Sequence, residues 1–211
     1  AVVKGIGADT RIGSSFLEAG LGYGGSCFPK DVDSLVHTSQ ELGAPFELLK
    51  AVAAENDSRV PRLTQRVVER LGDGGPKPLS GKCIAILGLA FKPDTDDMRE
   101  AKSIEICARL REAGAALRAY DPVATEKARP LLGEEGIEYC RSAYEAAQHA
   151  DAAVIVTEWR EFIQLNLSRL GDSMNQPIIF DGRNIYTPEQ VAAAGIEYHS
   201  IGRPSVGPKE S

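Results

Sequence analysis

The run Ala152-Ala153-Val154-Ile155-Val156-Thr157 decides the fold, because a short stretch without a charged side chain is typical of a strand buried on both faces. Short, mainly apolar runs also occupy 83–87, 116–120, 137–139 and 178–181, and helical patterns lie between or after these runs at 104–113, 124–132, 143–148 and 188–194. Buried strands that alternate with helices build a parallel sheet covered on both sides. We therefore predict a Rossmann-like, doubly wound parallel-sheet domain over 82–203, followed by a flexible tail at 204–211.

A small helical segment is expected before this domain, which makes the whole chain α/β. The spacing of apolar residues predicts one helix at 31–42 and a second at 46–59. Pro61 should break or kink the second helix before a helical pattern resumes and ends at Gly72. The stretch 73–81 holds three glycines and two prolines, as a linker does, so we place the domain boundary there and assign 1–75 to the helical segment.

The stretch most suggestive of chemistry is Gly22-Tyr23-Gly24-Gly25-Ser26-Cys27-Phe28-Pro29-Lys30-Asp31. Pro29 is typical of a first helical turn, so Cys27 should lie at or beside the N-cap. Free N–H groups and the positive end of the helix dipole would there favour the thiolate, the reactive form. Lys30 and Asp31 lie three and four positions after Cys27, so their side chains should lie on the same face of that turn as the thiol. A cysteine that serves only packing is the alternative.

Loops that follow strands matter next, because a doubly wound sheet binds ligands beyond the carboxyl ends of its strands. The loop 88–100 lacks a G-x-G-x-x-G turn, so we do not expect this domain to bind NAD, although Asp121 follows the second strand, where a ribose-binding acid often lies. Phe91, Lys92 and Arg99 would suit a base and phosphates. A solvated loop is the other interpretation.

Two more residues follow strands. The planar fork of Arg183, after the fifth strand, could hold a phosphate or sugar hydroxyls, or it could be an exposed surface cation. Removing Lys92 or Arg183 should then weaken ligand binding with little change in stability. Trp159, after the fourth strand, suits packing and ligand stacking equally.

Composition narrows the functional classes. The chain has 211 residues, 43% hydrophobic and 26% charged, with a net charge of −6, which suits a globular protein and gives no general attraction to nucleic acid or anionic membranes. There is no apolar stretch of about 18 residues and no leader, so we expect a cytoplasmic protein. Four cysteines and three histidines show no metal-ligand spacing. The sequence begins without methionine, as part of a longer protein would.

Several segments together resemble the UDP-glucose/GDP-mannose dehydrogenase family. They are Asp9-Thr10-Arg11-Ile12-Gly13, Phe16-Leu17, the glycine-cysteine run, Gly88-Leu89-Ala90-Phe91-Lys92, Asp97-Met98-Arg99-Glu100, Thr157-Glu158-Trp159 and Asp181-Gly182-Arg183-Asn184. The Cys-Phe-Pro-Lys-Asp and Thr-Glu-Trp forms are more similar to members that act on UDP-glucose than to those that act on GDP-mannose or N-acetylmannosamine nucleotides.

The resemblance implies that a sugar C6 alcohol is oxidised to a carboxylate in two NAD-dependent steps. It implies that Cys27 forms a thiohemiacetal and then a thioester, and that Asp31 positions or deprotonates water. Cys27, Lys30 and Arg99 would contact NAD. The substrate, UDP-glucose or a related nucleotide sugar, would be bound by Arg11 from a neighbouring subunit and by Phe16, Leu17, Glu18, Gly20, Leu21, Tyr23, Gly24, Phe91, Lys92 and Arg183.

Family members begin with an NAD-binding domain and a connecting helix that this sequence does not contain. NAD would therefore be bound mainly by that domain, and this chain alone should not turn over. The resemblance also implies a homo-oligomer, a dimer or higher, with 1–75 as a central dimerisation segment. The alternatives are a nucleotide-sugar binding module without redox chemistry, a dehydrogenase of another UDP- or GDP-sugar, and a cysteine hydrolase or acyl transferase with His37 as its base.

Overall fold

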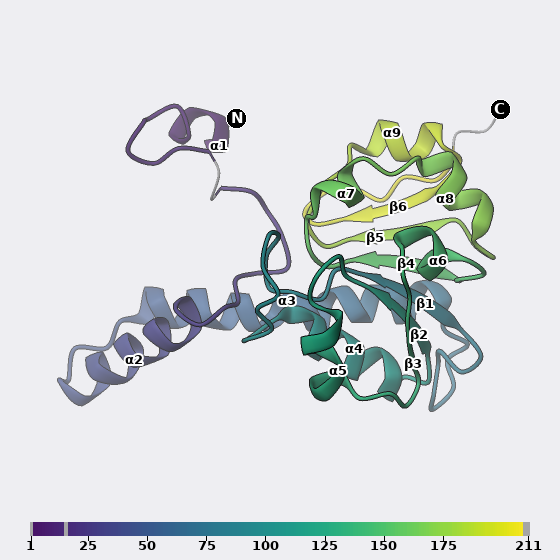
Figure 1. Cartoon of the computed structure of the whole chain (residues 1–211). Coiled ribbons are helices and arrows are strands. Elements are labelled where there is room, and N and C mark those ends of the chain that lie inside the picture. The colour runs from purple at the N-terminus through teal and green to yellow at the C-terminus, as the bar shows by residue number, and fades with distance from the viewer. Residues whose placement is uncertain (1, 15–16, 209–211) are drawn as a thin grey trace.

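The computed structural model describes residues 2–14 and 17–208, and within them six strands form one parallel sheet (Figure 1). The strands are β1 (Cys83–Leu87), β2 (Ala116–Tyr120), β3 (Ile137–Tyr139), β4 (Ala152–Ile155), β5 (Ile178–Asp181) and β6 (Glu197–Ser200). Their order, β3-β2-β1-β4-β5-β6, is that of a Rossmann sheet, with every neighbouring pair parallel. The predicted doubly wound fold is confirmed, although β4 ends two residues before the predicted Thr157 and β6 was not predicted.

Helices cover both faces of this sheet. One face carries α4 (Lys102–Glu112), α5 (Thr125–Leu132) and part of α3 (Glu47–Leu71), and the other carries α6 (Ala143–Ala147), α7 (Arg160–Ile163), α8 (Leu167–Ser173) and α9 (Pro188–Ala193). Strand β1 shows why its sequence is apolar throughout. Ile84 and Ile86 pack into the first layer, whereas Ala85 and Leu87 pack into the second.

Of the break or kink predicted at Pro61, the break is wrong, because α3 runs without interruption over 25 residues. Proline removes one backbone hydrogen bond from a helix, and burial of the following turns compensates for it. Leu63 and Val67 are at most 1% exposed and belong to the same core cluster as the sheet. The 73–81 linker therefore connects two parts of one core, and the domain boundary there stays a prediction.

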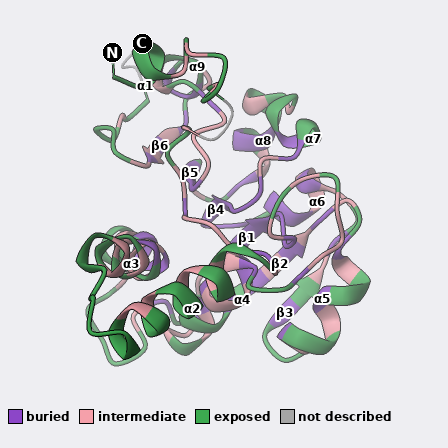
Figure 2. Cartoon of the chain, turned by 90° about the vertical axis from the view of Figure 1, so that its left-hand side faces the viewer, coloured by how far each residue is buried: buried purple, intermediate pink, exposed green. Residues whose placement is uncertain are grey.

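Two other helices lie outside this core. Helix α2 (Phe28–Glu41) begins three residues earlier than predicted, has no buried residue, and extends beside the first half of α3 away from the sheet (Figures 1 and 2). Helix α1 (Val2–Ile6) lies apart from the sheet and its covering helices (Figure 1). None of the helices in the described parts of the chain is both long and apolar enough to cross a membrane.

The tail predicted for 204–211 is held in one place. Val206 and Tyr198 exchange two backbone hydrogen bonds, with N···O distances of 2.8 and 3.0 Å, as an antiparallel bridge at the β6 edge of the sheet. Residues 209–211 lie outside the described parts of the chain.

Candidate functional site

Cys27 is the N-cap residue of α2, as the position of Pro29 predicts. Its side chain is exposed, and its carbonyl accepts the first intrahelical hydrogen bond, from the N–H of Asp31 at 3.0 Å. The Ser26 hydroxyl lies 3.7 Å from the Cys27 sulfur. The thiol therefore stands at the N-terminus of α2, which is the positive end of the helix dipole.

An open hollow of about 630 Å³ contains this thiol. It is lined by Gly25, Ser26, Cys27, Pro29, Lys30, Asp33, Arg99 and Glu100. The pKa of Lys30 is raised mainly by its hydrogen bond to Asp31, and the pKa of Arg99 mainly by its bond to Asp97; the nearby Cys27 adds a smaller upward shift to each. Two cations thus lie near the Cys27 sulfur.

Glycines bring this stretch against the loop that follows β1. The Gly25 N–H donates to the Arg99 carbonyl at 3.0 Å. A Cβ atom on Gly24 would lie 2.2 Å from the Glu100 carbonyl oxygen, and one on Gly25 would lie 2.7 Å from the Phe91 ring. Both contacts exclude any larger residue, so the glycines are required by close packing of two loops.

Arg183 lies where the chain leaves β5, and its side chain is only 15% exposed. Its Nε donates to the Val156 carbonyl at 2.8 Å and lies 3.3 Å from the Glu158 carboxylate. Burial lowers the pKa of its guanidinium, and the charges of Glu158 and Asp181 oppose that shift. The exposed surface cation that the sequence left open is excluded. Because the side chain is buried, we now expect its removal to lower stability as well as ligand binding.

Asp121 is 3% exposed, and both of its carboxylate oxygens accept hydrogen bonds from other groups of the protein. One carboxylate oxygen accepts from the N–H groups of Leu89 and Ala90 and from the Trp159 indole, at 2.7, 3.1 and 3.1 Å. The other accepts from the N–H groups of Val123 and Ala124, at 2.9 and 2.8 Å. Asp121 therefore ties the ends of the strands together and has no free oxygen for a ribose, and Trp159 is a buried packing residue.

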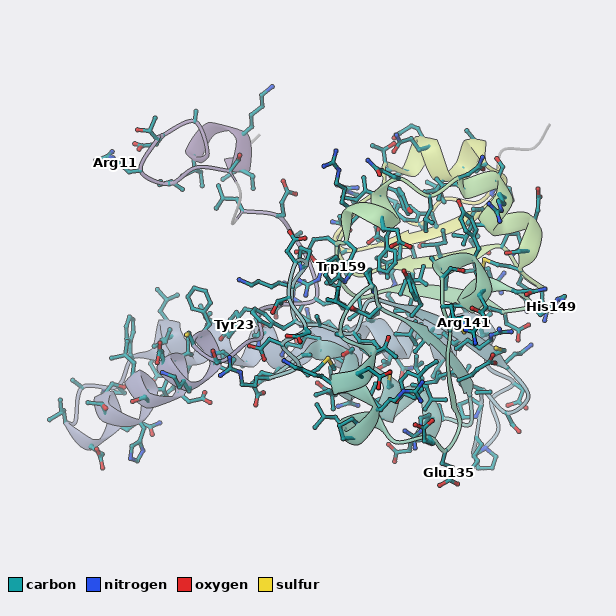
Figure 3. All side chains as sticks on the ribbon, viewed as in Figure 1. Arg11, Tyr23, Glu135, Arg141, His149 and Trp159 are labelled. Carbon is teal, nitrogen blue, oxygen red and sulfur yellow. The ribbon has the colours of Figure 1, made fainter. Side chains whose placement is uncertain are left out.

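The remaining predicted substrate residues are more scattered. Arg11 is 87% exposed, pairs with Asp9 and lies far from Tyr23 (Figure 3). Leu17 is half-buried, Glu18 is exposed, and the Leu21 side chain is buried in the core, which leaves only its backbone for a ligand. Phe16 lies outside the described residues.

The other predicted positions lie nearer to Cys27 and Arg183. A Cβ atom on Gly20 would lie 3.3 Å from the Gly182 carbonyl oxygen, beside Arg183. Lys92 is exposed, with its Nζ 5.3 Å from the centre of the Phe91 ring.

His37 does not serve Cys27 as a base. Ten positions along a helix correspond to roughly 15 Å of axial rise. The His37 imidazole is exposed and pairs instead with Glu41 at 3.3 Å. The hydrolase alternative therefore lacks its base among the described residues.

Two residues near the site were missed. Asn56 of α3 is 8% exposed and accepts the Tyr23 N–H at 2.8 Å. Glu158 has a buried carboxylate oxygen, Oε2, which forms an ion pair with Arg183 Nε at 3.3 Å but makes no hydrogen bond within the described residues. A polar residue close to the buried side of a helical pattern was the available signal for Asn56, and the Thr-Glu-Trp motif was the signal for Glu158.

The chain matches two domains of one family. Residues 85–188 match the UDP-glucose/GDP-mannose dehydrogenase family, UDP binding domain, and residues 1–58 match the central domain of the same family. The UDP-glucose 6-dehydrogenase YwqF of Bacillus subtilis is 48% identical over 99% of this chain and 46% of its own length. A UDP-glucose 6-dehydrogenase of Rhizobium meliloti is 48% identical over 96% of this chain and 45% of its own length.

A solved structure shows the same family resemblance. A UDP-glucose dehydrogenase from Pyrobaculum islandicum superposes with a TM-score of 0.77 at 34% identity, over 94% of this chain and 42% of that one. The chain spans less than half the length of these relatives. Because two adjacent domains match in family order and the similarity extends over nearly every residue, the chain belongs to the UDP-glucose/GDP-mannose dehydrogenase family.

Proposed function

We propose that this chain is the part of an NAD-dependent UDP-glucose 6-dehydrogenase that supplies the nucleophilic cysteine and the nucleotide-sugar surface. One observation carries the proposal: an exposed thiol at a helix N-terminus, with Lys30 and Arg99 beside it, is packed against the loop after β1 of a Rossmann sheet. Family membership and the identity to UDP-glucose 6-dehydrogenases support it.

The nucleotide sugar would lie across two loops. Phe91 and Lys92 offer an aromatic ring and a charge after β1, and Arg183 offers a guanidinium after β5. A base can stack on the ring, and cations can bind the diphosphate through charge-assisted hydrogen bonds. The backbone at 17–24 runs from this edge to Cys27, so a sugar attached to the diphosphate would be directed toward the thiol.

Cys27 would act as the covalent nucleophile. A first oxidation would convert the C6 alcohol into an aldehyde, to whose carbon the Cys27 sulfur would add. The resulting thiohemiacetal keeps the intermediate bound until a second oxidation gives a thioester, and hydrolysis by water then releases the carboxylate and restores the thiol. Lys30 and Arg99 stabilise the sulfur anion. Asp31 would orient or deprotonate the attacking water.

Bound NAD would accept the hydrides that these two oxidations release. Lys30 and Arg99 fit it, because both line the open hollow beside Cys27 and carry charges suited to phosphates. The sheet edge does not fit its pyrophosphate, because Asp121 already accepts from the Leu89 and Ala90 N–H groups that follow β1. We infer that NAD is bound mainly by a domain outside this chain.

The test has two arms. Calorimetric titration of UDP-glucose into this chain should show weak binding, and the same sample with NAD should form no NADH. In the protein of full natural length, UDP-glucose should drive NADH formation. Binding without any NADH formation by the full-length protein would favour a nucleotide-sugar binding module, and no binding at all would refute the proposed surface.

We also propose that 1–75 includes a contact between two copies of the protein. The outer apolar side chains of α2 and the first half of α3 are exposed: Phe28 61%, Leu35 50%, Phe46 43%, Leu48 71% and Val52 44%. Burying such side chains between subunits is favourable by roughly 25 cal/mol per Å². Ultracentrifugation should detect a dimer or higher oligomer, and Leu48→Lys should shift it toward monomer.

A further inference from the structure

A single peptide unit upstream of Cys27 is held from both sides. The N–H of the peptide between Gly22 and Tyr23 donates to Asn56 Oδ1 at 2.8 Å, and its carbonyl accepts from Arg183 Nη1 at 3.3 Å. Figure 3 shows Tyr23 close to the ribbon of α3, the helix that carries Asn56. One bond therefore comes from a helix and the other from the end of the sheet.

Both supports are rigid. Asn56 is 8% exposed and lies one turn before Val60, where α3 enters the core. Arg183 is fixed by the Val156 carbonyl and by the Glu158 carboxylate, at 2.8 and 3.3 Å. Side chains locked in this way can hold a loop within the narrow tolerance that a reacting group needs.

The loop itself is shaped to fit between them. Gly22 has a φ of +93°, which other residues rarely adopt, and a Cβ atom there would lie 2.3 Å from Asn56 Oδ1. Beyond Tyr23, the Gly25 N–H is bound by the Arg99 carbonyl, so the backbone is fixed again before it reaches Cys27. The position of the thiol is thus set by contacts on its N-terminal side as well as by α2.

We propose that Asn56 is a positioning residue, which clamps the Gly22–Tyr23 peptide against Arg183 and so places Cys27 relative to the nucleotide-sugar surface. Glu158 serves the same clamp by holding the guanidinium. This proposal rests on the proposed function, and it adds that Arg183 links the nucleotide end of the site to the cysteine loop. Loss of the clamp should lower kcat more than it raises KM, because misplacement of a reacting group by about 1 Å costs roughly a hundredfold.

The first test needs no enzyme activity. Amide hydrogen exchange at Tyr23, measured by NMR on this chain, should be at least about tenfold faster in Asn56→Ala than in the natural sequence, because the buried acceptor is lost. Asn56→Asp keeps the acceptor oxygen and should restore protection. Ser58→Ala is the matched control on the same helix, since among the described residues the Ser58 hydroxyl makes hydrogen bonds to Glu55 alone.

The second test uses the protein of full natural length. Asn56→Ala should lower kcat roughly 10- to 100-fold with KM changed less than about threefold, and Asn56→Asp should recover most of it. Should Asn56→Ala not fold, Gly22→Ala opens the same clamp from the loop side and should give the same two effects.

Unchanged Tyr23 exchange in a folded Asn56→Ala or Gly22→Ala variant would overturn the clamp. The clamp would also be overturned if Asn56→Asp lost as much kcat as Asn56→Ala while the Tyr23 amide of Asn56→Asp remained fully protected from exchange. If the natural full-length protein forms no NADH from UDP-glucose, the proposed function fails, and the exchange measurement still decides the clamp.

Discussion

Replacement of Asp121 by Asn should strongly destabilise the chain. The two carboxylate oxygens accept five N–H groups, all from loops at the ends of the strands. An Asn side chain keeps one oxygen and places an NH₂ group where the other stood. In its less costly orientation the oxygen retains three donors, and the N–H groups of Val123 and Ala124 face another donor.

The expected cost follows from those contacts. The bond of the Ala124 N–H is buried, so that donor costs about 1–3 kcal/mol without an acceptor, whereas Val123 is exposed and water can accept from its N–H. The three retained bonds lose their charge-assisted character, about 1 kcal/mol each. Because such terms are not additive, we take about 4 kcal/mol as the lower figure, which for a chain of this size lowers the Tm by roughly 8–16 °C.

Thermal unfolding followed by fluorescence provides the assay, because Trp159 is the only tryptophan in the sequence and its indole donates to Asp121. Asp172→Asn is the control, since Asp172 is exposed on α8 and should change stability by no more than about 0.5 kcal/mol. A Tm within about 2 °C of the natural chain would refute the structural role. Lost NAD affinity with unchanged stability would restore the ribose-binding interpretation.

Three further predictions concern the site. In the full-length protein, Cys27→Ser should slow oxidation by several orders of magnitude and leave UDP-glucose binding nearly intact, because a hydroxyl is a poorer nucleophile than a thiolate; near-normal turnover would exclude the covalent role. Lys92→Ala and Arg183→Ala should each weaken UDP-glucose binding about ten- to a hundredfold by calorimetry, but only Arg183→Ala should lower the Tm, because Arg183 is buried and Lys92 is exposed. The hydrogen bond from the Arg99 side chain is the largest cause that lowers the pKa of Asp97 to about 2, so its contribution to stability is present above pH 4 or so and is lost as the pH falls toward 2. Because Arg99→Gln keeps the backbone N–H that also bonds Asp97, an NMR titration should find that pKa raised only part of the way toward about 4, and an unchanged value would contradict the side-chain pairing.

The sheet was predictable because its signal is local. A strand buried on both faces is mainly apolar, and the predicted bounds of β1, β2, β3 and β5 agree with the structure although Arg118, Glu138 and Asp181 lie in the last three. Helices α7 and α8 have 4 and 7 residues and were not predicted, although the equally short α6 and α9 were. Proline ordinarily breaks a helix, but at Pro61 tertiary packing outweighs this preference, because Leu63 and Val67 are buried in the core that the helix shares with the sheet.

The site was predictable only in part, for the same reason. Cys27 at a helix N-cap follows from Pro29 two positions later, a local relation. The contacts that place Cys27 are not local: Tyr23 and Asn56 are 33 positions apart, and Gly22 and Arg183 are 161 apart. No spacing rule relates such positions, so Arg183 was assigned to a ligand, and its bond to the loop remained unseen.

The carboxyl edge of this sheet differs from that of a dinucleotide-binding Rossmann fold, because the protein's own side chains bind the backbone groups there. Asp121 takes the Leu89 and Ala90 N–H groups that would otherwise face a phosphate. Between β1 and β4, a Cβ atom on Gly88 would lie 2.5 Å from Thr157, whose hydroxyl donates to the Ala90 carbonyl at 2.6 Å. The crevice at the switch point is therefore occupied by the protein's own groups, and the groups left free for a ligand lie farther out on the loop that meets the cysteine stretch. Such a surface requires that the cysteine loop and the sheet keep fixed positions relative to each other. Helix α3 can provide this, because it shares its core with the sheet and carries Asn56 at the point where the cysteine loop passes.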